Sequence, residues 1–453
     1  MGKKTLSVLV LSTLCAVNGL LAATPPADLR ELVECTPRDG WPHFFEKVDA
    51  GEPVTVAYLG GSITAQSGWR VQTLDWLRSQ YPDVKFTEVN AAIGGTGSDL
   101  GVFRLQKDVL DHHPDLLLVE FAVNDGSAPA DKIHKAMEGI IRQTLAAYPD
   151  CDIGFVYTLT KAFIDTLGQG KMTASASAME DVADHYGLPS IQFGDAIIKL
   201  YKDDKIEMVA DESQLAIPSG DTLNEQASAM VASGDKIPFS RDGVHPYPNT
   251  GHVLYTQAFI RSFPIIEAAS LGNDSGGLPA PLDTDNWEDA QMIPLAPGDM
   301  ISLTGPTEEL DLATDPTGKR FQNRMRTLWK LSPGSELTFK FKGTKVMIYD
   351  LKGSGCDAVE VELDGKTRTI DRFDGYCTYY RISAVNVGDN LPDTVHTVKI
   401  RPLANSVDKA KVLFEKNRPD MEKNPEKYAA SDWYAGELML VGELVSLDVQ
   451  PAE

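Results

Sequence analysis

The sequence has little positive charge for its length and no long apolar run beyond its N-terminus. Among 453 residues, 42 are lysine or arginine and 65 are aspartate or glutamate, which gives a formal net charge of −23. A surface this acidic repels phosphate backbones and anionic membranes, so nucleic acid is excluded as an expected partner. The one prominent apolar run, residues 6–21, is too short and too poorly flanked for a membrane span.

That apolar run instead has the layout of a secretory signal peptide. Lys3 and Lys4 precede it, and the small residues Ala22 and Ala23 follow it. We predict a leader at residues 1–23 and a secreted or periplasmic protein, whose net charge becomes −25 because the leader holds two lysines and no acid. A lipoprotein would need Cys15 as its acyl acceptor, but the bulky Leu14 precedes that cysteine where a small residue is required.

Cysteine is scarce, and the four cysteines after the leader are far apart in sequence: Cys35, Cys151, Cys356 and Cys377. They form no C-x-x-C pair and have no histidine close by, so they do not suggest a zinc cluster. No metal site and no cofactor are expected for this chain. Export permits disulfides, and two pairings are considered. Cys356 with Cys377 would bridge a hairpin, and Cys35 with Cys151 would be the remaining pair.

The chain is too long for one ordinary core, so two domains are expected. Short apolar, partly β-branched runs predict buried strands at 54–59, 85–90, 116–121 and 153–157. Helical spacing separates them at 69–79, 100–110, 133–147 and 174–185. Strands that alternate with helices predict a parallel sheet covered on both faces, with the ligand site at the carboxyl ends of the strands.

The pattern changes in the second half of the chain. Residues 206–239 form a long polar stretch, which is either a lid over the site or surface decoration. Around residues 271–285 the composition turns to Gly, Ser, Pro and Asp, and beyond it apolar residues alternate with a period of two. We therefore place the first domain at 24–270, a linker at 271–292, and a β-sandwich or jelly-roll-like domain at 293–453.

Two short segments of the first domain carry groups suited to nucleophilic catalysis. Ser62 follows the first predicted strand and two glycines, which exposes a hydroxyl at the rim of the expected site, although Gly-Gly-Ser is also an ordinary turn. The G-x-S-x-G motif of α/β-hydrolases is absent from the sequence. Asp242 and His245 lie three residues apart near the end of the same domain. They can supply the base that a serine needs and the acceptor that orients it, or Asp242 can simply form a turn.

Two further loops at strand ends offer donors for an oxyanion hole. Gly95 in residues 90–95 could present a backbone amide, and Asn124 in residues 121–126 a side-chain amide. Both loops can equally be plain turns.

Taken in order, Ser62 in GGSIT, Gly95 in NAAIGG, Asn124 in AVND, and Asp242 with His245 in DGVH resemble the four blocks of the SGNH/GDSL hydrolase superfamily. The resemblance covers about half of the chain. It implies a flavodoxin-like three-layer α/β/α domain and a metal-independent serine esterase. Gly-Gly-Ser replaces the usual Gly-Asp-Ser, and an alanine, the second residue before Asn124, replaces the usual glycine.

The resemblance also implies roles and a substrate class. Ser62 would attack, His245 would act as base and acid, Asp242 would orient the imidazole, and Ser62, Gly95 and Asn124 would donate to the oxyanion. With its predicted export and its added β-domain, the chain resembles the extracellular members that are carbohydrate O-acetylesterases. Acetylated carbohydrate is therefore the expected substrate.

Several alternatives stay open at this point. The enzyme could be a lipase, a thioesterase or an acyltransferase, and a non-catalytic glycan-binding protein would not need all four blocks. Trp69 and Arg70, just after the nucleophile turn, could contact a substrate, although Trp69 is expected to pack in the core and Arg70 to form an ion pair or lie on the surface.

Overall fold

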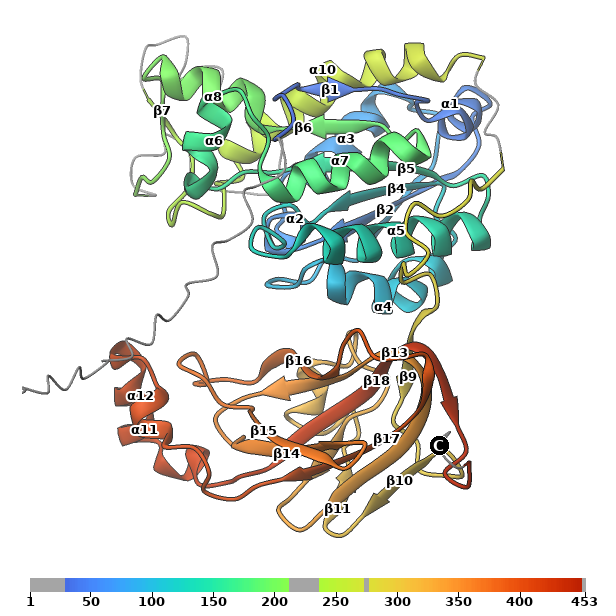
Figure 1. Cartoon of the computed structure of the whole chain (residues 1–453). Coiled ribbons are helices and arrows are strands. Elements are labelled where there is room, and N and C mark those ends of the chain that lie inside the picture. Colours follow the sequence, from blue (N-terminus) through green and yellow to red (C-terminus); the bar gives the residue numbers. More distant parts are fainter. Residues whose placement is uncertain (1–28, 212–235, 273–276, 450–453) are drawn as a thin grey trace, which may run out of the picture.

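The computed structural model describes residues 29–211, 236–272 and 277–449, which form two domains (Figure 1). The predicted leader, 1–23, and most of the predicted insertion, 206–239, lie outside the described residues. In the described parts of the chain, no helix combines the length and the apolar character that a membrane crossing requires.

The N-terminal domain is built on a six-stranded sheet with the order β1-β6-β5-β4-β2-β3. Only β1 is antiparallel to its neighbour. The strands are β1 (Cys35–Thr36), β2 (Val54–Gly60), β3 (Phe86–Asn90), β4 (Leu116–Glu120), β5 (Asp152–Tyr157) and β6 (Ser190–Gln192). The five parallel strands have the flavodoxin-like order, in which ligands bind where the order reverses, at the carboxyl ends of β2 and β4.

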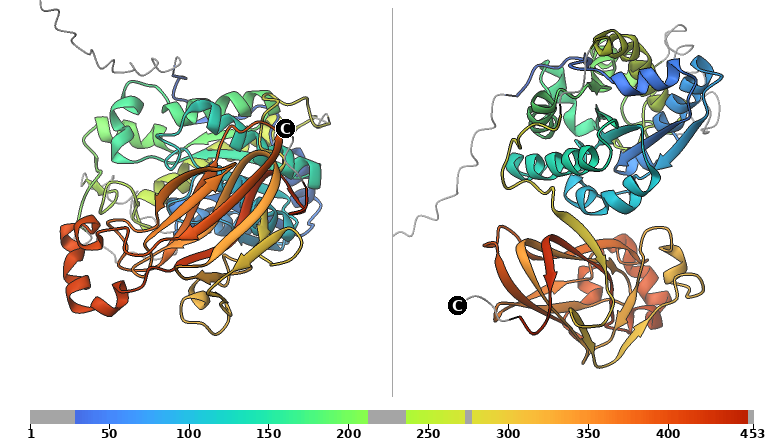
Figure 2. Two further views of the ribbon diagram at one scale, coloured as in Figure 1. Left: turned by 60° about the horizontal axis from the view of Figure 1, so that its bottom comes forward. Right: turned by 90° about the vertical axis from the view of Figure 1, so that its right-hand side faces the viewer.

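Helices cover both faces of this sheet, as Figure 2 shows, and each face has its own buried cluster. On one face α4 (Ser98–Asp108), α5 (Ala130–Ala147) and α7 (Ala174–Tyr186) pack together. On the other are α1 (Pro42–Asp49), α3 (Trp69–Gln80) and α10 (Gly251–Ser270). The predicted three-layer α/β/α arrangement is therefore present, and strands such as β4 are apolar because both of their faces are buried.

Shorter elements complete the domain. They are α2 (Ser62–Ala65), α6 (Ile164–Gly168), α8 (Gly194–Lys202), η1 (Leu110–His112), η2 (Lys161–Phe163), and the parallel pair β7 (Ile206–Glu207) and β8 (Ile237–Pro238). The pair β7 and β8 flanks the undescribed part of the polar stretch.

The C-terminal domain consists mainly of antiparallel β-strands, which confirms the prediction of a β-rich second domain. Its strands are β9 (Ala290–Pro294), β10 (Ile301–Thr304), β11 (Thr307–Glu309), β12 (Trp329–Leu331), β13 (Glu336–Lys352), β14 (Ala358–Leu363), β15 (Lys366–Asp371), β16 (Arg381–Gly388), β17 (Thr394–Pro402) and β18 (Trp433–Val445). Short helices α11 (Lys409–Val412) and α12 (Arg418–Lys423) and the 3-10 turns η4 (Gly318–Arg320), η5 (Glu415–Asn417) and η6 (Pro425–Tyr428) lie in its loops.

The long strand β13 organises this domain by changing partners along its length. Along one edge it pairs with β10 over residues 336–339 and with β18 from residue 340 onward. Along the other edge it pairs with β17 over residues 337–343 and with β16 from residue 346 onward. On this second edge the change from β17 to β16 follows Gly343, which lies opposite Gly442 of β18, and the φ angles of the two glycines are 154° and 134°. A side chain on Gly343 would overlap the carbonyl of Val441, so this crossover requires glycine.

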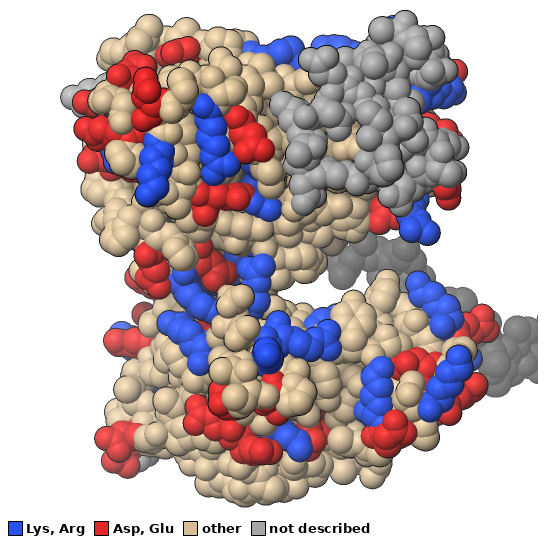
Figure 3. All heavy atoms as spheres, turned by 180° about the vertical axis from the view of Figure 1, so that it is seen from behind, with Lys and Arg blue, Asp and Glu red and all other residues tan. Residues whose placement is uncertain are grey.

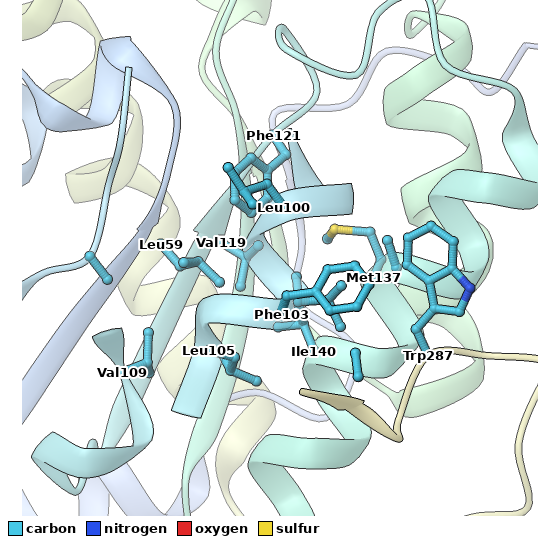
Figure 4. Close-up of a cluster of buried hydrophobic side chains, with 14 of the residues drawn as sticks. Leu59, Leu100, Phe103, Leu105, Val109, Val119, Phe121, Met137, Ile140 and Trp287 are labelled. Carbon is cyan, nitrogen blue, oxygen red and sulfur yellow. The ribbon is translucent and has the colours of Figure 1, made fainter. Parts of the chain in front are cut away.

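The segment between the domains packs against the first domain at Trp287. Its ring centroid lies 6.0 Å from that of Phe103 on α4, and Figure 4 shows it beside Met137. A Cβ on Gly139 of α5 would lie only 2.6 Å from the Trp287 carbonyl, so that glycine permits the close approach. One buried cluster then continues from α4 and α5 to β13 and β18, which joins the domains through apolar contacts. The predicted boundaries at 270 and 292 stay predictions.

The two considered disulfides are absent, because Cys35, Cys151, Cys356 and Cys377 are all free thiols. Strand β6 lies between β1, which holds Cys35, and β5, which begins directly after Cys151. Two strand spacings are about 10 Å, beyond the reach of a disulfide. Cys356 and Cys377 each bond locally instead, the first to the Leu351 carbonyl and the second with Asp374.

Acidic and basic side chains are interspersed over the face seen in Figure 3, on both domains. The strong net negative charge of the sequence does not gather there into one acidic patch.

Candidate functional site

The nucleophile turn joins β2 to the short helix α2. Gly61 is the N-cap of α2 and Ser62 its first residue, so the Ser62 side chain leaves the sheet at the carboxyl end of a central strand. A Cβ on Gly61 would overlap the Asn124 side-chain oxygen. Glycine is therefore needed here for the loop after β4 to approach the nucleophile turn.

Ser62, His245 and Asp242 form one hydrogen-bonded chain. The distance from His245 Nε2 to Ser62 Oγ is 2.8 Å, and the distance from His245 Nδ1 to Asp242 Oδ2 is 2.7 Å. Because ionised Asp242 can only accept, Nδ1 carries a proton and neutral His245 presents the Nε2 lone pair to the serine hydroxyl. This arrangement can remove the Ser62 proton during attack on an acyl carbon.

The loop that carries Asp242 and His245 is held rigid by its own hydrogen bonds. Asp242 Oδ1 accepts from the backbone amides of His245 at 2.8 Å and Val244 at 2.9 Å. Gly243 has a φ of 81°, and its amide donates to Ser240 Oγ. The turn thus positions both catalytic candidates from one short segment.

Asp242 stays ionised in this setting. Burial acts to raise the pKa of Asp242, but the hydrogen bond with the His245 side chain and the amides of His245 and Val244 lower it to about 2. The carboxylate can therefore accept a hydrogen bond from the imidazole and orient it at neutral pH.

The two predicted oxyanion loops approach the serine from different strands. A Cβ on Gly94 would lie 3.5 Å from the Ser62 Cβ, and Gly95 beside it has a φ of 74° and open space around it. Asn124, after β4, packs its side chain against Gly61. The structure thus brings Gly94, next to Gly95, and Asn124 to the serine turn, and the roles of Gly95 and Asn124 as donors stay predictions.

Three buried polar residues near the site were not singled out from the sequence: Glu120, Asp125 and His252. Glu120 ends β4, where its carboxylate accepts from Thr64 Oγ1 at 2.9 Å and Thr158 Oγ1 at 2.8 Å. Burial raises the pKa of Glu120, against hydrogen bonds from Thr158, Thr64 and the Gly61 amide. A single acid at the end of an otherwise apolar strand was the signal that could have identified it.

Trp69 and Arg70 are both buried, which corrects the possibility, raised from the sequence, that they contact a substrate. Trp69 is fully buried between Tyr58 and Phe193, at ring-centroid distances of 5.4 Å from each. Arg70 is 4% exposed and forms an ion pair with Glu88. Trp69 therefore packs in the core and Arg70 forms an ion pair, as the favoured alternative for each residue predicted.

His252 lies behind the nucleophile turn as a buried neutral group. Its Nδ1 accepts from the Trp69 amide at 3.1 Å, and its Nε2 is 3.3 Å from Gln66 Oε1. Burial, with the charges of His245 and Arg70, lowers the pKa of His252 to about 3.

We expect His252 to make the fold sensitive to acid. Below pH 6.5 the unfolded chain takes up a proton at this residue and the folded chain does not, so stability falls as the pH drops from about 6.5 to 3. The His252→Asn variant should lose roughly 3–5 kcal/mol of that pH dependence. Urea unfolding at pH 7 and pH 4 measures it, with the exposed His112→Asn as control. An unchanged pH dependence in His252→Asn would contradict this assignment.

Residues 58–246 match the model of a family described as GDSL-like Lipase/Acylhydrolase. None of the curated proteins matches the chain.

Two crystal structures of a two-domain esterase (CEX) active on acetylated mannans resemble the chain over both domains. One of them was co-crystallized with mannopentaose. Each is 19% identical and covers 90% of this chain and 97% of its own, with TM-scores of 0.67 and 0.64. At this identity the likeness concerns the fold.

Proposed function

This chain belongs to the GDSL-like lipase/acylhydrolase family, an esterase family, and we propose that it is a secreted serine esterase that removes O-acetyl groups from carbohydrate. The observation that carries the catalytic part is the hydrogen-bonded chain from Asp242 through His245 to Ser62. It lies at the carboxyl end of β2, beside the point where the strand order of the sheet reverses.

In the proposed mechanism Ser62 Oγ attacks the acetyl carbon while its proton passes to His245 Nε2. The carbonyl oxygen becomes an oxyanion that accepts from the Ser62 and Gly95 amides and the Asn124 side chain. Collapse breaks the ester C–O bond, and His245 gives its proton to the departing sugar oxygen. Water, deprotonated by His245, then attacks the acetyl-enzyme, and its collapse releases acetate and returns the proton to Ser62.

The substrate class is supported by the arrangement of the whole chain. The leader predicted at residues 1–23 would direct export, and the solved structures that resemble both domains are described as an esterase active on acetylated mannans. Acetylated mannan is therefore the first substrate we propose to test. The acyl chain length that the enzyme accepts distinguishes this proposal from a lipase.

We also propose that the C-terminal domain is a jelly-roll-like β-sandwich. The support is that β13 changes partners along both of its edges, and that one buried cluster combines residues of these strands. Phe339 and Ile348 lie on β13, Val361 on β14, Ile400 on β17 and Leu438 on β18.

Acetate release from acetylated mannan, xylan and chitin-type oligosaccharides, together with a p-nitrophenyl ester series of rising chain length, tests the proposed function. We expect cleavage of acetyl esters and a loss of about tenfold or more in kcat/KM at longer acyl chains. Equal or better cleavage of long-chain esters would instead favour a lipase. No hydrolysis of any ester would contradict the proposed activity, and acetyl transfer to added sugar without acetate release would indicate an acyltransferase.

A further inference from the structure

Asp125 lies where the two loops of the proposed oxyanion hole meet. Its backbone directly follows Asn124, and its carboxylate accepts from the Ser98 amide, at 3.1 Å to Oδ1 and 3.3 Å to Oδ2. Ser98 is the first residue of α4, directly after the loop that contains Gly94 and Gly95. One carboxylate thus connects the loop of one proposed donor to the loop of the other.

The contact also completes the beginning of helix α4. The N-cap of α4 is Gly97, which has no side chain to accept hydrogen bonds from the first turn. Asp125 does this from another element, and its ionised form places a negative charge at the positive end of the helix dipole. The side chain is 4% exposed, and a Cβ on Gly97 would overlap its Oδ1, so the carboxylate has little freedom to move.

The surroundings of Asp125 disfavour its ionised form, which is not expected of a residue whose role is only to stabilise the fold. Burial raises the pKa of Asp125 to about 7, against the hydrogen bonds of Ser98, and the nearby Asp99 and Glu120 add to the effect. A buried acid whose ionisation is opposed by two neighbouring acids costs stability, and such groups are concentrated at functional sites.

We propose that Asp125 is a positioning residue of the oxyanion hole, which fixes the Asn124 side chain relative to the backbone of Gly94 and Gly95. This inference rests on the proposed function. Donors must lie about 2.7–3.1 Å from the developing oxyanion, so a loop displacement of about 1 Å weakens transition-state binding with little effect on the ground state.

Steady-state kinetics of Asp125→Ala and Asp125→Asn on an activated acetyl ester test the proposal. We expect Asp125→Ala to lower kcat about 100-fold with KM changed less than about threefold. Asp125→Asn keeps an acceptor oxygen and should recover most of this loss. The matched control is Asp131→Asn, which removes an exposed carboxylate from the first turn of the neighbouring helix α5 and should leave kcat unchanged.

A double-mutant cycle with Asn124→Ala separates positioning from a general structural role. If Asp125 acts through the donors, Asp125→Ala should cost less than about fivefold in the Asn124→Ala background. The same factor in both backgrounds, or an unchanged kcat in Asp125→Ala, would overturn the proposal. If Asp125→Ala does not fold, Gly97→Ala serves instead, because the added methyl group would overlap Asp125 Oδ1 and displace the carboxylate. It should lower kcat in the same way.

The proposed function can fail separately from this inference. If the wild-type protein hydrolyses no ester, the esterase assignment itself is wrong. If the wild type is active and both Asp125→Ala and Gly97→Ala are equally active, only the positioning role of Asp125 is wrong.

Discussion

Ser62→Ala is expected to lower kcat for acetyl ester hydrolysis by about 10⁴- to 10⁶-fold. Ser62 Oγ is the only protein atom in the proposed mechanism that bonds to the acyl carbon of the substrate, and the hydrogen bond of 2.8 Å to His245 Nε2 is what activates it. KM should change little, because the hydroxyl contributes to the transition state and not to ground-state binding. Initial rates on p-nitrophenyl acetate and on acetylated mannan measure the effect.

The matched control is Ser79→Ala, at the exposed carboxyl end of α3, which should retain wild-type activity. Both variants should unfold at the same urea concentration as the wild type, since neither serine is part of the core. Substantial activity in Ser62→Ala, with Ser79→Ala also active, would mean that another nucleophile carries the reaction.

His245→Ala should lower kcat by a similar factor, about 10⁴-fold or more, because serine is a weak nucleophile without a base to remove its proton. The loss should not add to that of Ser62→Ala. The double variant is expected to be as slow as either single variant within about tenfold, since both residues act as one unit. Stopped assays with high enzyme concentration make these slow rates measurable.

His185→Ala, on the exposed end of α7, is the matched histidine control and should leave kcat unchanged. A fully additive loss in the double variant would mean that Ser62 and His245 work independently, in conflict with the hydrogen bond between them.

The fold of the first domain could be predicted in its main features because its strands bury both faces. The apolar run at β4 (Leu116–Glu120) is continuous, and it differs clearly from the helical spacing of α5 (Ala130–Ala147). Strand β6 (Ser190–Gln192) has only three residues and the antiparallel β1 only two, too few for any periodicity to appear. The partner change of β13 depends on pairing between distant segments, which no local pattern records.

The approach of the site residues could be predicted for the same reason, since Ser62 and Asn124 follow neighbouring strands of one sheet. The surroundings of the site residues could not be predicted. Arg70 is buried because Glu88, on β3, lies beside it, and Asp125 is buried because α4 begins at its carboxylate. In the sequence, Asn-Asp-Gly is simply a turn, and only the tertiary structure gives its aspartate a partner.

Covalent labelling of the serine tests the central claim most directly. The wild-type protein, Ser62→Ala and His245→Ala would each be treated with a fluorophosphonate, and the labelled peptide identified by mass spectrometry. The account predicts one label, on Ser62, in the wild type, with none in Ser62→Ala and a strongly slowed reaction in His245→Ala. A label on another residue, or an active protein that stays unlabelled while it hydrolyses acetyl esters, would contradict it.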